Sequence, residues 1–186
     1  MREAQKEKVA IDSDFIFKLA EIKDDDRVNL CKKLFDELLF APLVHELLRK
    51  HELEPMSANV RQFIDKDVIS ICEFLHELSP AEKLYYESVV RSVYKQLMGV
   101  DYPVDDIFDE WKRSKSLGEV HTISMCALLK YSIFLSDDND SKKAVEILIK
   151  SFPRSSEIRV FTRKETIDLL PDGVIPRRER NKFRHI

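Results

Sequence analysis

Three acidic residues occur where a β-sheet could bring them together. Asp12 ends the apolar run 9–11, Asp138 follows the apolar run 132–136, and Glu119 is the third residue of a helix-like stretch that leads into that second run. Ligands of open parallel sheets bind beyond the carboxyl ends of the strands. Carboxylates gathered there would repel one another unless a cation lay between them, and Mg²⁺ or Mn²⁺ prefers such oxygen ligands. The spacing therefore predicts a site for a divalent cation.

Short apolar runs alternate with stretches of helical periodicity, which is typical of an α/β fold. The expected strands are 9–11, 38–42, 68–72, 132–136 and 157–162. The expected helices are 15–22, 27–39, 43–53, 79–98, 117–131, 141–152 and 163–170. Because crossovers between parallel strands place helices on the sheet faces, we expect a mainly parallel central sheet of about five strands with helices on both faces.

The helix expected at 79–98 has the clearest start signal in the chain. Ser79 is a suitable N-cap, Pro80 fits the first helical position, and Glu82 stands where a capping box needs it. This helix and the weakly patterned, acidic connector after it form a helical insertion at about 76–115.

Length and composition predict one principal domain. With 186 residues, 44% of them hydrophobic, the chain can bury a sizeable core. We expect that domain to span residues 1–170 and a basic tail to span 171–186. The formal net charge is only −3, so nucleic-acid binding would have to be local. The tail carries the basic residues expected to bind a phosphate backbone: Arg177, Arg178, Arg180, Lys182 and Arg184. The alternative is that this segment packs on its own domain.

Other residue types exclude several kinds of site. The cysteines Cys31, Cys72 and Cys126 are an odd number, far apart and in apolar segments, which indicates reduced core thiols and a cytoplasmic protein. His45 and His121 lack partners at zinc-site spacing, so we expect them at the surface or half-buried. Neither a signal peptide nor a membrane span is expected, and the three glycines form no phosphate-binding loop.

Four segments, taken in order, resemble the successive acidic motifs of the PIN-domain nucleases. They are Asp12-Ser13-Asp14 after an apolar strand, FAPLVHEL with Glu46, LGEVHTISMCALL with Glu119, and FLSDDND with Asp138. The resemblance covers residues 8 to about 150 and implies a PIN-like fold. The chain departs from the family pattern at Asp14, where asparagine is common, and the pair Asp137 and Asp138 leaves the last ligand open by one residue.

The resemblance implies a Mg²⁺- or Mn²⁺-dependent endoribonuclease that hydrolyses RNA phosphodiester bonds. Asp12, Glu46, Glu119 and Asp138 would be its catalytic residues. The metal ligands would be Asp12, Glu119, Asp138 and Asp140. Ser13, Asp14, Ser136 and Asp137 would support them. The resemblance also leaves open an antitoxin or other inhibitory protein, as in toxin–antitoxin pairs, and a homodimer.

Two other functions compete with this interpretation. One is a degenerate PIN domain that binds RNA or protein without catalysis, since a fold does not guarantee activity. The other is a haloacid-dehalogenase-type phosphatase, with Asp12 as nucleophile and Asp14 as acid/base. In the phosphatase motif, however, a glycine and then a threonine or valine normally follow, where this chain has Phe15 and Ile16.

Overall fold

The structure is a computed structural model, and it describes residues 6–22, 26–41, 43–46, 58–72, 74–103, 105–108, 117–153, 157–170, 173 and 175–184. The strands are β1 (Val9–Ile11), β2 (Leu43–Glu46), β3 (Ile69–Cys72), β4 (Ile133–Leu135) and β5 (Arg159–Phe161). The helices are α1 (Ser13–Ala20), α2 (Arg27–Glu37), α4 (Ala58–Asp65), α5 (Pro80–Met98), α6 (Leu117–Leu129), α7 (Asn139–Ser151), α8 (Arg163–Asp168) and α9 (Arg177–Arg184), with a 3-10 turn η1 at Phe74–His76.

The five strands form one parallel sheet in the order β3-β2-β1-β4-β5. β2 is added on one side of β1 and β3 on the far side of β2. β4 then pairs with the other side of β1, and β5 pairs with β4. The direction of winding therefore reverses between β1 and β4, which is where parallel α/β sheets leave a crevice for ligands. The predicted α/β class with a parallel sheet is confirmed.

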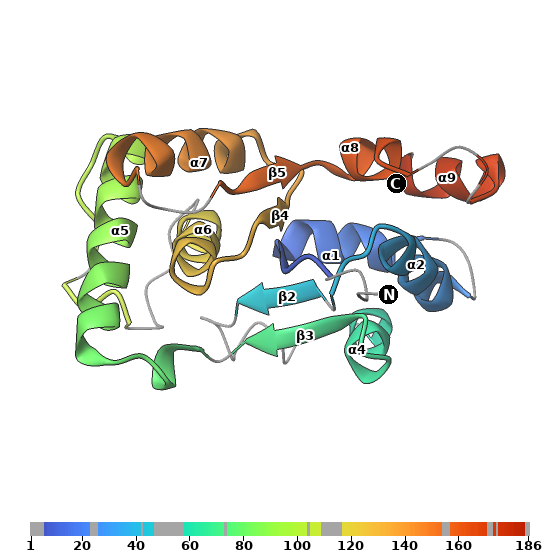
Figure 1. Ribbon diagram of the computed structural model, residues 1–186, viewed down its shortest axis with the longest axis horizontal. Coiled ribbons are helices and arrows are strands. Elements are labelled where there is room, and N and C mark those ends of the chain that lie inside the picture. The colour runs from blue at the N-terminus through green and yellow to red at the C-terminus, as the bar shows by residue number, and fades with distance from the viewer. Residues whose placement is uncertain are drawn as a thin grey trace, which may run out of the picture.

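Helices cover both faces of this sheet, and alternate residues of each strand face opposite layers. Val9 and Ile11 of β1 belong to a core shared with α1, α2, α4, α8 and α9. Ala10 belongs to a second core shared with α5, α6 and α7. The two groups of helices lie at opposite ends of the view in Figure 1. The continuous burial of β1 and β4 explains why their sequences read as short apolar runs.

The start of α5 follows the sequence prediction. Ser79 caps the helix, Pro80 is its first residue, and Glu82 completes a capping box. Gly99 then ends the helix in the left-handed conformation, which glycine adopts without steric cost. The helix contacts α6 and α7, and several of its side chains are fully buried, so this part of the expected insertion belongs to the second core layer.

The second strand lies later in the chain than the sequence predicts. The expected strand at 38–42 is wrong: Phe40 forms only an isolated bridge with Glu7, and β2 begins after Pro42. The expected helix at 43–53 is also wrong over Leu43–Glu46, and its remainder falls outside the described residues. A short apolar run does not distinguish strand from helix, and here pairing with both β1 and β3 decides the conformation. Helix α4 is absent from the sequence prediction.

The basic C-terminal segment includes a packed helix. Phe183 of α9 is only 1% exposed and lies in the same core as β1. Arg180 donates hydrogen bonds to the carbonyl oxygens of Ile175 and Leu170, and Arg184 pairs with Asp168 of α8. Among the described residues, no helix has the length and apolar composition needed to cross a bilayer.

The packing of α9 predicts a stability effect. Phe183→Ala should lower the free energy of unfolding by about 3 kcal/mol, because it removes a buried ring and leaves a cavity. Asn181→Ala, at an exposed position of the same helix, is the control and should change stability by less than about 0.5 kcal/mol. Urea unfolding monitored by circular dichroism measures both. Equal stability of the two variants would contradict the packing of α9.

Candidate metal centre

Asp12 lies at the middle of the carboxyl-terminal edge of the sheet, directly after β1. It is the N-cap of α1, its side chain is largely buried, and one carboxylate oxygen accepts a hydrogen bond of 2.8 Å from the backbone N–H of Ser13. The other oxygen lies 3.4 Å from the hydroxyl oxygen of Ser136, which follows β4. The chain itself continues the sheet for one more residue, since the N–H of Asp12 bonds to the carbonyl oxygen of Leu135. The carboxylate of Asp12 is thus held by residues that follow both β1 and β4, the two strands between which the winding reverses.

The charge environment of Asp12 is unfavourable to its ionised form. Burial raises its pKa, and the charges of Glu119, Asp14 and Asp138 raise it further, to about 7. The hydrogen bond from the N–H of Ser13 opposes this shift only in part. These acids therefore lie close enough to Asp12 to interact with it electrostatically. The structure thus brings Asp12 within electrostatic range of Glu119 and Asp138, and a metal site shared by these acids and Glu46 stays a prediction.

Asp138 is held beside Asp12 through a chain of hydroxyl groups. It is the N-cap of α7, and its carboxylate accepts a hydrogen bond of 2.8 Å from the N–H of Asp140. Its own N–H bonds to the hydroxyl oxygen of Ser136 at 3.1 Å. The hydroxyl groups of Ser136 and Ser141 lie 2.9 Å apart, and both serines are completely buried. Ser136 thus bonds to the carboxylate of Asp12 and to the backbone of Asp138, and its role in supporting a metal site stays a prediction.

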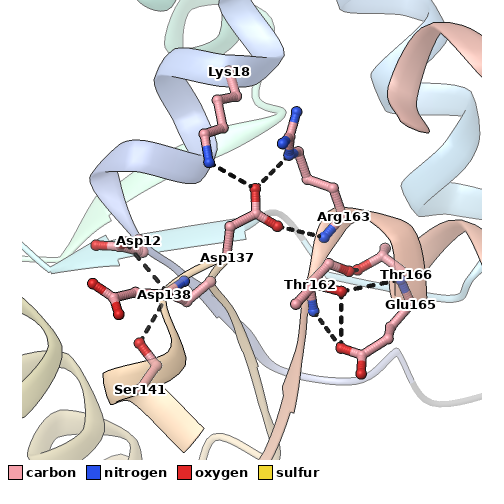
Figure 2. Close-up of polar contacts among 10 residues, drawn as sticks. Asp12, Lys18, Asp137, Asp138, Ser141, Thr162, Arg163, Glu165 and Thr166 are labelled. Atoms are coloured by element: carbon pink, nitrogen blue, oxygen red, sulfur yellow. Dashed lines mark hydrogen bonds and ion pairs between the residues drawn. The ribbon is translucent and has the colours of Figure 1, made fainter. Parts of the chain in front are cut away.

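Asp137 points away from this group, as Figure 2 shows. Its carboxylate forms ion pairs with Lys18 of α1 and Arg163 of α8, and it also accepts the backbone N–H of Arg163 at 2.9 Å. Burial alone would raise the pKa of Asp137, but the hydrogen bonds and charges of these partners lower it below its ordinary value. Of the two neighbouring aspartates, Asp138 is therefore the one that faces Asp12.

The remaining predicted acids are less closely associated with Asp12. Glu46 is the last residue of β2, and the pairing of Ala10 with Val44 puts its backbone level with that of Asp12; its side chain is outside the described residues. Asp14 is exposed in the first turn of α1. Asp140 pairs with Lys143 at 2.8 Å, on its own helix.

Each acid near Asp12 stands at the start of a helix. Asp12 and Asp138 are N-caps, and Glu119 is in the first turn of α6. Helix N-termini carry partial positive charge and unpaired N–H groups, which partly offset the repulsion among the carboxylates. Within the described part of the chain, no three Asp, Glu, His or Cys side chains lie close enough together to hold a metal ion as they stand. Carboxylates are ligands that a hard cation prefers, but these side chains would have to move to bind one together.

Two features near this site were not expected from the sequence. His121 is only 2% exposed, so the expectation of a surface or half-buried histidine is wrong. Its two ring nitrogens lie 2.7 Å from the hydroxyl oxygens of Tyr86 and Tyr102, respectively. The second feature is the ion-paired group of Lys18, Asp137 and Arg163. Its members are far apart in the sequence, and no local pattern marks them.

Comparisons with protein-family models, with curated proteins and with solved structures give no match to this chain. The site is therefore interpreted from its own geometry and charge.

The pKa of Asp12 predicts how stability varies with pH. A folded-state pKa near 7, against an ordinary value of 3.8, means that the folded chain binds a proton more tightly than the unfolded chain. The free energy of unfolding should then fall as pH rises from about 4 to 7, and stay low above that. Asp12→Asn removes this cost and keeps an N-cap, so it should stabilise the metal-free protein at pH 8 by on the order of 3 kcal/mol.

Chemical denaturation at several pH values measures this effect. Asp65→Asn changes an exposed aspartate of α4 in the same way and should leave the pH profile unaltered. Parallel profiles for the wild type and Asp12→Asn between pH 4 and 7 would contradict the pKa assigned to Asp12.

Proposed function

We propose that this chain is a metal-dependent endoribonuclease of the PIN-domain type. The observation that carries the proposal is the burial of Asp12 where the sheet reverses its winding, with Ser136 bonded to both Asp12 and Asp138. The charges of Glu119, Asp14 and Asp138, which raise the pKa of Asp12, support it. Burying carboxylates close together costs free energy, because their charges repel one another. A divalent cation bound between them would offset that repulsion, which is why such a group indicates a metal site. Asp12, Glu119 and Asp138 are also the acids of three of the sequence motifs that resemble those of PIN-domain nucleases.

In the proposed reaction, Asp12, Glu119 and Asp138 would hold Mg²⁺ or Mn²⁺. Such an ion polarises a phosphate and lowers the pKa of a bound water. Ser13 and Ser136 fix the carboxylate of Asp12, while the first turn of α7 fixes that of Asp138. We assign Glu46 the binding of a second ion or the orientation of the attacking water. Asp140 would join only after leaving Lys143.

RNA is the proposed substrate, and α9 offers part of its binding surface. Arg177, Arg178 and Arg184 have exposed side chains, whereas Arg180 and Lys182 are half-buried. An RNA strand lying along this helix would contact the exposed arginines through its phosphates.

Binding without catalysis is the second candidate function. It is favoured by the present spacing of the acids, since no three described metal-binding side chains are close enough to hold an ion without moving. Two results distinguish catalysis from binding alone: whether the wild type cleaves RNA, and whether that cleavage is lost when Asp12 is replaced.

Asp12→Asn should reduce Mn²⁺-dependent cleavage of single-stranded RNA at least a hundredfold, because it removes a charged ligand and little volume. The fold should persist, as circular dichroism would show, since asparagine also caps helices. Asp65→Asn should cleave as the wild type does. Full cleavage by Asp12→Asn would refute the site, and no cleavage by the purified wild type would favour the binding-only function.

Metal binding should also be visible in thermal stability. At a Mn²⁺ concentration about a hundred times its dissociation constant, linkage stabilises the folded state by about 2.7 kcal/mol. For a chain of this length, that is a rise in Tm of roughly 5 to 10 °C. The shift should be much smaller for Asp138→Asn. Differential scanning calorimetry measures both, and identical shifts would show that Asp138 does not bind the ion.

A further inference from the structure

Lys18 is a cation held at the border of the acidic site. It lies in the last turn of α1, the helix that Asp12 begins, and its side chain reaches back to Asp137, which directly precedes Asp138. Its ammonium nitrogen is 3.1 Å from one carboxylate oxygen of Asp137. Figure 2 shows Lys18 and Arg163 meeting the carboxylate of Asp137 from above, with Asp12 and Asp138 lower in the view on the same side as Lys18. Lys18 is therefore tied to the same loop that carries a proposed metal ligand.

Asp137 gives Lys18 a rigid support. The side chains of Asp137 and Arg163 are each only 15% exposed, and Arg163 bonds to both carboxylate oxygens through its backbone N–H and its side chain. The side chain of Lys18 is 36% exposed. An ammonium group has three N–H donors, and Asp137 is the one partner of Lys18 in the described part of the chain. Two donors therefore remain to bind an anion from solvent.

The charge on Lys18 is also less fully balanced than that on Lys142 and Lys143 of α7. Lys142 pairs with Glu165, and Lys143 pairs with Asp140. Lys18 instead shares its carboxylate with Arg163. A strand of nucleic acid approaching several carboxylates needs cations nearby to accept the phosphates that flank the reacting one.

We propose that Lys18 binds a backbone phosphate of the RNA strand next to the phosphate held at Asp12, Glu119 and Asp138. This inference rests on the proposed function, and it defines the substrate as a polynucleotide instead of a small phosphodiester. Asp137 and Arg163 are positioning residues that fix Lys18 at one place relative to Asp138.

Two variants of Lys18 test this role. Lys18→Gln should weaken the binding of a fluorescent single-stranded RNA oligonucleotide about tenfold, because one charge-assisted hydrogen bond is lost. The slope of log affinity against log salt should become shallower by about 0.7, the value for one phosphate contact of a single strand. Lys18→Arg keeps the charge and should restore most of the affinity. Lys83→Gln removes the same charge from an exposed site on α5 and is the matched control.

A second substrate separates this inference from the proposed function. Bis(p-nitrophenyl) phosphate is a phosphodiester without a neighbouring phosphate, so Lys18→Gln should hydrolyse it within about twofold of the wild-type rate. If the wild type cleaves neither substrate, the proposed function fails, and the RNA-binding slope still decides the role of Lys18. An unchanged slope, the absence of RNA binding by the wild type, or equal losses on both substrates would overturn the role of Lys18.

Discussion

The burial of Asp12 beside other carboxylates is the constraint on which this site depends. Asp12 is only 8% exposed and follows a strand that is buried along its whole length. Its backbone N–H bonds to the carbonyl oxygen of Leu135, so the backbone of Asp12 is held to β4. The cost of the charge must therefore be met locally, through the N–H of Ser13, the hydroxyl of Ser136, a bound proton or a bound cation.

The same constraint explains the arrangement of the surrounding helices. Parallel strands separated by crossovers release each helix from the carboxyl-terminal edge of the sheet, so α1 and α7 both begin beside Asp12. In the first turns of these helices, the N–H groups of Ser13 and Asp140 donate hydrogen bonds to the carboxylates of Asp12 and Asp138. Asp138 has two effects: its side chain caps α7, and its charge raises the pKa of Asp12.

The sequence allowed the α/β class and several local features of the fold to be predicted, whereas features that depend on particular distant partners were missed. Ser79, Pro80 and Glu82 act within one helical turn, and Asp12 directly follows its strand, so near neighbours determine these features. Strand β2 depends instead on partners on both sides of it. Asp137 and Asp138 are adjacent and chemically identical, and the ion pairs of Asp137 with the distant Lys18 and Arg163 could not be read from that local sequence. The buried environment of His121 likewise arises from tyrosines on other segments.

The contacts of His121 impose a direction on its hydrogen bonds. In a neutral imidazole one ring nitrogen donates and the other accepts, so the hydroxyls of Tyr86 and Tyr102 must take opposite roles. Tyr86 also lies 3.5 Å from the carbonyl oxygen of His121, within range to donate to it, which favours Tyr86 as the acceptor from the ring and Tyr102 as the donor. Although both residues are tyrosines, they are not interchangeable in this arrangement: the hydroxyl of Tyr86 accepts a hydrogen bond from one ring nitrogen of His121, and that of Tyr102 donates one to the other.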